Sequence, residues 1–293
     1  MQADALPPAP AAGAAYGGQM HTLRDGTPVP HVGFGTYPLR GEEGIEAMLS
    51  ALEVGYRYLD TAVNYENEPE VGEALRRSGL PREDVLVATK IPGRAHRRDA
   101  AITSVEESLE RLGLEQVDVA LVHWPNPSQG HYVEAVEALI ECRDRGLVRY
   151  VGTSNYTESH LREVLAATGE APVLNQVECH PLFPQQEMLR VHEELGVLTQ
   201  AWSPLGKQEA QYDAAPVTEA AERAGVSPAQ VILRWHLDRG VMPLPKSGTR
   251  SRQESNLDVL GFELVPEEVE AITALGRPDG RLFDGDPETH EEM

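Results

Sequence analysis

Eight short apolar runs recur along this chain, and amphipathic stretches separate them. A short apolar run bounded by turn residues is typical of a buried strand, whereas the stretches between the runs, such as 100–113 and 228–240, have the periodicity of a helix. Strands that alternate with helices predict a parallel sheet. The eight runs lie at 32–36, 56–62, 85–91, 117–123, 150–154, 173–178, 197–202 and 241–245.

Eight strand–helix units in 293 residues predict an α/β fold, the (β/α)8 TIM barrel. A doubly wound sheet is the alternative, but its first turn usually carries a Gly-x-Gly-x-x-Gly motif. Here Gly33-Phe34-Gly35 provides only the first half of it. Glycines mark the expected helix ends at positions 55, 79, 113, 146, 169 and 196.

The N-terminal region contains two further features. Residues 20–23 and the segment from Val29 flank an Asp25-Gly26 turn, which predicts a β-hairpin that closes the bottom of the barrel. Residues 1–18 are rich in Ala, Pro and Gly and contain no Lys or Arg, which indicates a disordered tail rather than a secretory signal. No shift in composition divides 19–293, so we expect a single barrel domain there.

Charge and cysteine content narrow the class of protein. The formal net charge of −22 argues against nucleic acid and anionic membranes as partners. No apolar run is long enough to cross a bilayer. Two cysteines, Cys142 and Cys179, favour a reducing compartment over a disulfide framework, so we expect a cytoplasmic protein.

Ionisable side chains end several of the predicted strands. Asp60 and Lys90 lie at the ends of two runs, His123 ends a third, and Tyr65 follows in a loop. The carboxyl ends of barrel strands meet at one face, where catalytic residues gather. An acid, a phenol, an ammonium and an imidazole at that face predict a proton-transfer site, and a cation beside a phenol lowers its pKa.

Three separated motifs resemble those of the aldo-keto reductases, in particular bacterial members similar to 2,5-diketo-D-gluconate reductases. The resemblance covers the chain from about Gly18 to the C-terminal region. It is carried by 55–62 with Tyr65, Asn67 and Glu68, by 108–113 with Asp118 and His123-Trp124-Pro125, and by Leu244-Pro245-Lys246-Ser247 with Arg252 and Asn256.

The resemblance implies a role for each strand-end residue. Tyr65 would be the general acid that protonates a carbonyl oxygen, and Lys90 would lower its pKa. Asp60 would pair with Lys90, and His123 would orient the carbonyl oxygen. Taken singly, each could be structural: an Asp–Lys pair, a core histidine, a surface tyrosine. Their occurrence together at strand ends favours catalysis.

The resemblance also implies NADPH/NADP+ as the cofactor. Ser154, Asn155 and Gln176 would hold the nicotinamide carboxamide, and Trp202 would stack on its ring. The cations Lys246 and Arg252, with Ser247, would bind the adenosine 2′-phosphate, so NADPH is expected over NADH. Ser255 stands where many relatives have Glu. The remaining expected cofactor contacts are Gly35, Thr36, Ser203, Leu205 and Asn256.

The substrate end is expected to be an aromatic mouth of Tyr37, Trp124 and Tyr65. A short loop at 125–130 and a polar, acidic tail at 277–293 predict an open pocket with few apolar walls. Small aldehydes, α-dicarbonyls or keto-sugars are therefore the expected substrates of a monomeric reductase, and no metal site is expected. Two alternatives remain open: an NADPH-sensing subunit with little turnover, and an aldolase that forms a Schiff base on Lys90.

Overall fold

The computed structural model describes residues 20–283 and 285–293, so the predicted tail at 1–18 lies outside the described residues. Eight strands follow one another in chain order around one sheet, and every neighbouring pair is parallel. They are β3 (Phe34–Gly35), β4 (Tyr58–Asp60), β5 (Leu86–Ile91), β6 (Val117–Val122), β7 (Val148–Ser154), β8 (Leu174–Glu178), β9 (Leu198–Trp202) and β10 (Val241–Pro243).

Backbone hydrogen bonds close this sheet into a barrel. The Gly33 amide donates to the Pro243 carbonyl at 3.0 Å, and the Gly35 amide donates to the Pro245 carbonyl at 3.2 Å. The first strand thus meets the last. Because the strand order never reverses, the doubly wound alternative is wrong and the predicted (β/α)8 barrel is confirmed.

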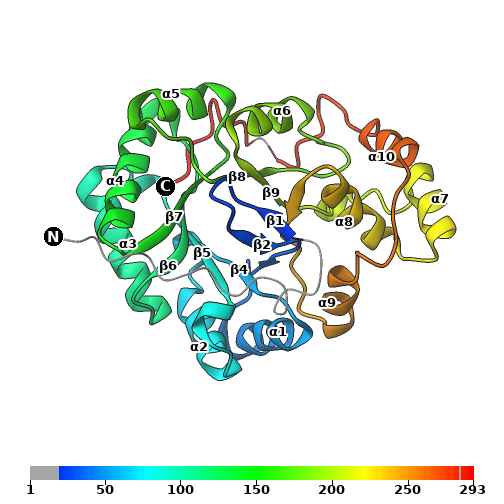
Figure 1. Ribbon diagram of the computed structural model, residues 1–293, viewed down its shortest axis with the longest axis horizontal. Coiled ribbons are helices and arrows are strands. Elements are labelled where there is room, and N and C mark those ends of the chain that lie inside the picture. The colour runs from blue at the N-terminus through cyan, green and yellow to red at the C-terminus, as the bar shows by residue number, and fades with distance from the viewer. Residues whose placement is uncertain (1–19, 284) are drawn as a thin grey trace.

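Helices surround the strands as an outer ring (Figure 1). Each strand is followed by at least one helix, and two follow each of β9 and β10. The helices are α1 (Gly41–Val54), α2 (Glu68–Ser78), α3 (Arg98–Leu112), α4 (Tyr132–Asp144), α5 (Glu158–Thr168), α6 (Gln186–Leu195), α7 (Ala215–Ala224), α8 (Pro228–Asp238), α9 (Arg250–Leu257) and α10 (Pro266–Thr273).

Glycines end the helices much as the sequence predicts. Gly79, Gly113, Gly169 and Gly196 are C-caps in the left-handed region, where a residue without Cβ is unstrained. Gly55 caps α1, also at positive φ. The remaining predicted stop lies one residue beyond the cap of α4. The stops place each chain reversal so that the next strand starts at the amino end of the barrel.

The predicted hairpin is present, with β1 (Met20–Thr22) antiparallel to β2 (Pro28–Pro30). It crosses the centre of the barrel in Figure 1. Leu23 and Val29 are buried in the barrel interior against residues from the starts of the strands, including Leu86 and Leu174. The hairpin therefore closes the amino end of the barrel, which leaves the carboxyl end for a ligand. No helix in the described part of the chain is both long and apolar enough to span a membrane.

Candidate active site

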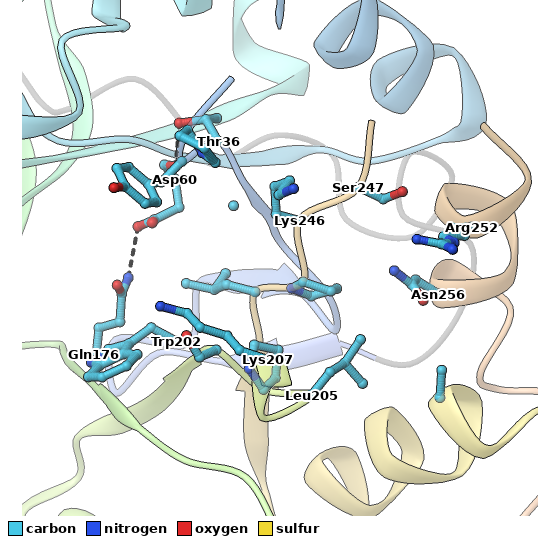
Figure 2. Close-up of a pocket in the computed structure, with 18 of the residues that line it drawn as sticks. Thr36, Asp60, Gln176, Trp202, Leu205, Lys207, Lys246, Ser247, Arg252 and Asn256 are labelled. Atoms are coloured by element: carbon cyan, nitrogen blue, oxygen red, sulfur yellow. Dashed lines mark hydrogen bonds between the residues drawn. The ribbon is translucent and has the colours of Figure 1, made fainter. Parts of the chain in front are cut away.

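A cavity of about 1050 Å³ opens at the carboxyl ends of the strands. Most of the residues that the sequence predicts for a site line it, and Figure 2 shows them on opposite walls, Asp60 and Gln176 at one end and Arg252 and Asn256 at the other. The predicted residues on the walls are Gly35, Thr36, Tyr37, Asp60, Tyr65, His123, Trp124, Asn155, Gln176, Trp202, Ser203, Leu205, Lys246, Ser247, Arg252 and Asn256.

Lys90 lies just behind this wall and connects two of its residues. Its Nζ is 2.7 Å from Oδ2 of Asp60, donates to the Thr61 carbonyl at 2.9 Å and lies 3.4 Å from the Tyr65 hydroxyl. The lysine side chain is fully buried and Asp60 is 4% exposed. The attraction to Asp60 and Tyr65 outweighs the opposing effect of burial and raises the pKa of Lys90. The ammonium is therefore a fixed positive charge beside the phenol.

The pKa of Tyr65 is raised above its ordinary value of 10.0, which differs from the expected direction. Burial is the largest cause, and the Asp60 carboxylate adds to it; the positive charge on Lys90 lowers the pKa, as predicted, but by less. The phenol consequently keeps its proton throughout the neutral range. A proton donor must carry its proton before the reaction begins, so the raised pKa is consistent with an acid.

The loop between β4 and α2 holds Tyr65 in place. Tyr65 ends a short 3₁₀ turn, Val63–Tyr65, and its carbonyl accepts a hydrogen bond from Nε of Arg40 at 3.0 Å. The buried Asn67 amide donates to the Thr36 carbonyl at 3.1 Å and to the Leu39 carbonyl at 2.9 Å. These bonds tie the loop to the segment after β3, which explains why Asn67 belongs to the same sequence motif as Tyr65.

His123 follows the last residue of β6, and its ring packs edge-on against the Tyr65 ring with centroids 5.7 Å apart. It is mostly buried, with 12% of its side chain exposed. Its Nδ1 lies 2.9 Å from Oε1 of Glu292, close to the end of the described chain. The two predicted proton-handling rings thus share one wall, and a carboxylate that the sequence did not predict lies behind the imidazole.

An amide network holds Trp202 in the cavity wall beside Gln176 (Figure 2). Asn155 Oδ1 accepts from the Trp202 indole at 2.8 Å, and its Nδ2 donates to the His123 carbonyl at 3.0 Å and to Ser154 Oγ at 3.1 Å. Ser154 itself does not line the cavity; its hydroxyl donates to the Gln176 carbonyl at 2.8 Å. Among these predicted contacts, Ser154 therefore supports Asn155 and Gln176 from behind the cavity wall and does not itself face the cavity.

Gln176 is oriented by two bonds to protein groups. Its Nε2 donates to Asp60 Oδ1 at 2.7 Å and to Gln200 Oε1 at 3.2 Å, the first of which is drawn in Figure 2. Because both amide hydrogens are used, the group that it can offer a ligand is its carbonyl oxygen. Through its bond to Asp60, Gln176 also links the Asp60–Lys90 ion pair to the side of the site that contains Trp202.

Three cations on the cavity wall have no carboxylate partner among the described residues. Lys207, Lys246 and Arg252 line the cavity, with Lys207 beside Trp202 and Arg252 at the far end in Figure 2, and none of them forms an ion pair with a described acidic residue. The chain contains only three lysines; two are on these walls and the third is Lys90. Unpaired cations in so acidic a chain attract anions, and a phosphate group is the kind of anion that such side chains can bind.

The C-terminal segment differs from the expectation of an open pocket with few apolar walls. Phe283 lines the cavity, with ring centroids 5.7 Å from Trp202 and 6.3 Å from Trp124. The His290 ring packs against Trp124 at an interplanar angle of 50°, with ring centroids 4.2 Å apart. Phe283 belongs to Leu282-Phe283, the one large apolar pair in the polar tail, and its ring contributes to an aromatic wall of the cavity.

Sequence reasoning missed the part of the wall that comes from the loop after β9. Lys207, Gln208 and Tyr212 line the cavity there, and 227–229 at the start of α8 complete it. Only Lys207 carries a signal in the sequence, because lysine is so rare in this chain. The others are ordinary loop residues whose place depends on how the loop folds back.

Comparison with known proteins decides the family. The family model described as "Aldo/keto reductase family" matches residues 31–277, which span all eight strands of the barrel. The chain belongs to the aldo/keto reductase family. This confirms the resemblance drawn from the three motifs.

Two characterised relatives are similar over nearly their whole length. 2,5-Diketo-D-gluconic acid reductase B of Corynebacterium sp. (strain SHS752001) is 50% identical over 272 residues, which cover 93% of this chain and 98% of the relative. Methylglyoxal reductase DkgA of Escherichia coli (strain K12) is 38% identical over 267 residues, covering 91% and 96%.

Solved structures of this family have the same fold. The aldo-keto reductase AKR2E4 of Bombyx mori, in complex with NADP, superposes with a TM-score of 0.86 at 30% identity and covers 93% of this chain and 97% of that one. A mutant of Gox0644 in complex with NADPH gives a TM-score of 0.88 at 36% identity, covering 93% and 98%. Members with this barrel therefore bind the reduced and the oxidised dinucleotide.

Proposed function

We propose that this aldo/keto reductase uses NADPH to reduce small aldehydes and ketones, α-dicarbonyls and keto-sugars among them, with Tyr65 as the general acid. The observation that carries the proposal is one cavity with two chemical ends. At one end, Tyr65 and His123 flank a buried Asp60–Lys90 pair, whose Nζ and Oδ2 are 2.7 Å apart. Towards the other end (Figure 2), Lys246 and Arg252 form a cationic site with no ion-pair partner among the described residues.

The residues present fit NADPH. The cations at the far end suit its phosphates, and the half-buried Trp202 ring offers a surface for stacking a flat ring. Gln176 offers its carbonyl oxygen and Asn155 the second lone pair of Oδ1, both suited to an amide donor. When bound, NADPH supplies the hydride. Gly35, Thr36, Ser203, Leu205, Ser247 and Asn256 complete the proposed cofactor contacts.

The chain's own residues then manage the charge on the substrate oxygen. A carbonyl oxygen becomes negative as its carbon accepts hydride, so a donor must stand within hydrogen-bond reach. The Tyr65 hydroxyl donates its proton to that oxygen, and the Lys90 ammonium at 3.4 Å stabilises the phenolate left behind. Asp60 holds Lys90, and His123 orients the oxygen from the neighbouring strand end.

Substrate size follows from the aromatic end of the cavity. Tyr37, Trp124 and Phe283 surround the approach to Tyr65, and Tyr37 is 54% exposed at the mouth. Small carbonyl compounds fit between these rings, and two relatives are named for such compounds, 2,5-diketo-D-gluconic acid and methylglyoxal. We therefore propose the same substrate class here.

The aldolase alternative requires a neutral lysine, because only the free amine attacks a carbonyl. Lys90 is fully buried against Asp60, and its raised pKa keeps it charged. Nothing in its surroundings supports a Schiff base. The two-ended cavity also has a cationic end that an aldolase does not need.

The proposal is tested by following loss of NADPH absorbance with a panel of small aldehydes, α-dicarbonyls and keto-sugars, with NADH in parallel. We expect turnover on at least one member and a higher kcat/KM with NADPH. Tight NADPH binding without turnover on any member would instead favour the sensing subunit. Equal kcat/KM with the two cofactors would contradict the assignment of the cationic end to a 2′-phosphate.

A further inference from the structure

The last residues of the described chain are held against the barrel by a socket that consists of Asn126 and Gly93. The backbone N–H of Glu292 donates to Asn126 Oδ1 at 3.1 Å, and Asn126 Nδ2 donates back to the Glu292 carbonyl. Asn126 is fully buried in the loop after β6. A Cβ on Gly93 would lie 1.9 Å from the Glu292 carbonyl oxygen, so only glycine permits this approach. The tail position is thus fixed by its backbone, independently of the side chain of Glu292.

The socket turns the Glu292 carboxylate towards His123. Oε1 lies 2.9 Å from His123 Nδ1 and accepts from Asn64 Nδ2, while Oε2 faces the Gly93 amide at 3.4 Å. Burial raises the pKa of Glu292, but His123, Asn64 and the Gly93 amide together lower it by more than burial raises it. The net pKa lies below the ordinary value of 4.5. The carboxylate is therefore ionised at neutral pH, and 17% of it is exposed.

The imidazole meets this carboxylate on the side away from the cavity. Glu292 does not line the cavity, whereas His123 does. The buried Nδ1 of His123 faces Glu292 in an ion-pair contact of 2.9 Å, which is not a well-aligned hydrogen bond. Among the described side chains, none donates to or accepts from Nε2. Which ring nitrogen carries the proton is set by the partner of the other. A carboxylate behind Nδ1 is the arrangement that fixes a catalytic imidazole in one orientation.

We propose that Glu292 is a positioning residue for His123, which it holds through Nδ1 so that Nε2 faces the carbonyl oxygen of the substrate. This rests on the role given to His123 in the proposed function. The C-terminal tail then supplies part of the reaction geometry in addition to a wall of the pocket. Glu292 acts only through the imidazole and touches neither substrate nor cofactor.

Replacement of Glu292 by Gln tests this proposal. Glu292→Gln keeps the backbone clamp but removes the charge, and we expect kcat for carbonyl reduction to fall by about tenfold to hundredfold, the range for the loss of one contact with a charged group. KM and the Kd for NADPH should stay unchanged. Glu291→Gln is the matched control, because Glu291 carries the same charge one residue earlier but contacts the Ser128 amide at 2.9 Å instead. It should leave kcat at the wild-type value.

A second pair of variants separates positioning from a general effect on the fold. In a His123→Ala background, adding Glu292→Gln should cost no further activity, because the ring through which the carboxylate acts is gone. An equal loss in both backgrounds would mean that Glu292 only holds the tail, and wild-type kcat in Glu292→Gln would overturn the proposal outright. His123→Ala alone tests the proposed function: if it keeps full turnover, the role of His123 fails first.

Discussion

The proton on Tyr65 is controlled by two opposing influences. Burial and the Asp60 carboxylate raise the pKa of the phenol, and the Lys90 ammonium 3.4 Å away lowers it. The net effect leaves a protonated donor beside a permanent positive charge. Transfer becomes favourable when an alkoxide forms, because an alkoxide is a stronger base than the phenolate that Lys90 stabilises.

Replacement of Tyr65 by Phe should abolish reduction with little change in cofactor binding. The ring remains and only the proton donor is lost, so we expect kcat to fall by about 10²- to 10⁴-fold, the usual contribution of a general acid. Steady-state turnover and NADPH titration measure the two effects. Tyr150→Phe is the control: its hydroxyl bonds Thr27 and Asp25 at the closed end of the barrel. Retained turnover in Tyr65→Phe would show that another group donates the proton.

The sequence predicts the four proposed catalytic-site residues because each lies at or just after a strand end, where parallel strands bring side chains together. Asp60, Lys90 and His123 need only the strand order to become neighbours. Glu292 could not be predicted, because its contact with His123 depends on a long loop that returns from α10. The pKa of Tyr65 was also unpredictable, since burial depends on the whole surrounding wall.

At the level of elements, helix α9 carries two arginines, Arg250 and Arg252, whose surroundings differ. Arg250 in its first turn pairs with Glu53 at 2.8 Å and with Glu254 at 3.0 Å. Arg252 has no such partner among the described carboxylates and lines the cavity beside Ser255 and Asn256. The sequence places both at the start of one helix, but only the structure distinguishes the paired from the unpaired guanidinium.

Arg252→Gln should therefore weaken NADPH binding but leave NADH binding unchanged. The loss of one charged contact to a phosphate corresponds to about 1.5–3 kcal/mol, or about tenfold to hundredfold in Kd. Fluorescence titration of Trp202 quenching with each cofactor measures it. Arg250→Gln, on the same helix, should bind both cofactors as the wild type does. A parallel weakening of NADH would place Arg252 elsewhere than at the 2′-phosphate.

Most strands are shorter than the apolar runs that predict them, although β7 begins two residues before its run at 150–154. The run at 56–62 contains a strand of only Tyr58–Asp60, although Tyr56 and Ala62 are buried as well. The run at 32–36 likewise contains only Phe34–Gly35, with Val32 buried beside it. Hydrophobicity reports burial, and a barrel also buries the ends of its loops. The sequence therefore predicts the order and number of strands better than their limits.

Across the whole molecule, several histidines are buried as neutral rings. Burial lowers the pKa of His192 and His236 to about 3. His192 accepts from Asn175 Nδ2 at 3.0 Å, so its other nitrogen donates to Thr199 Oγ1, which lies 2.7 Å away. A second proton would have no acceptor in this arrangement. The folded state therefore resists protonation that the unfolded chain accepts.

This predicts a loss of stability on mild acidification. The unfolded histidine binds a proton below its ordinary pKa of 6.5, while the folded one does not until about 3, so stability present above 6.5 is lost as the pH falls. Each such histidine contributes a slope of up to about 1.4 kcal/mol per pH unit. His192→Gln should reduce the slope of the unfolding free energy between pH 6.5 and about 5, above the range where most carboxylates titrate.

Urea unfolding at several pH values measures that slope. Near pH 8 neither state binds the extra proton, so the curves of wild type and variant should run parallel there and serve as the internal control. An identical slope for the two proteins below pH 6.5 would mean that His192 is not the group that titrates. The variant's absolute stability does not enter the comparison, because only the slopes are compared.

The scarcity of lysine has a practical consequence for chemistry on this protein. Positive charge away from the cavity is arginine, so the only side-chain amines belong to Lys90, which is buried, and to Lys207 and Lys246 on the cavity wall. Amine-reactive labels and activated supports would thus couple to the protein through the cavity proposed to hold its cofactor, apart from any α-amino group. Coupling through some of its 47 carboxylates would instead leave the cavity open. An immobilised form of this enzyme should be attached by its acids.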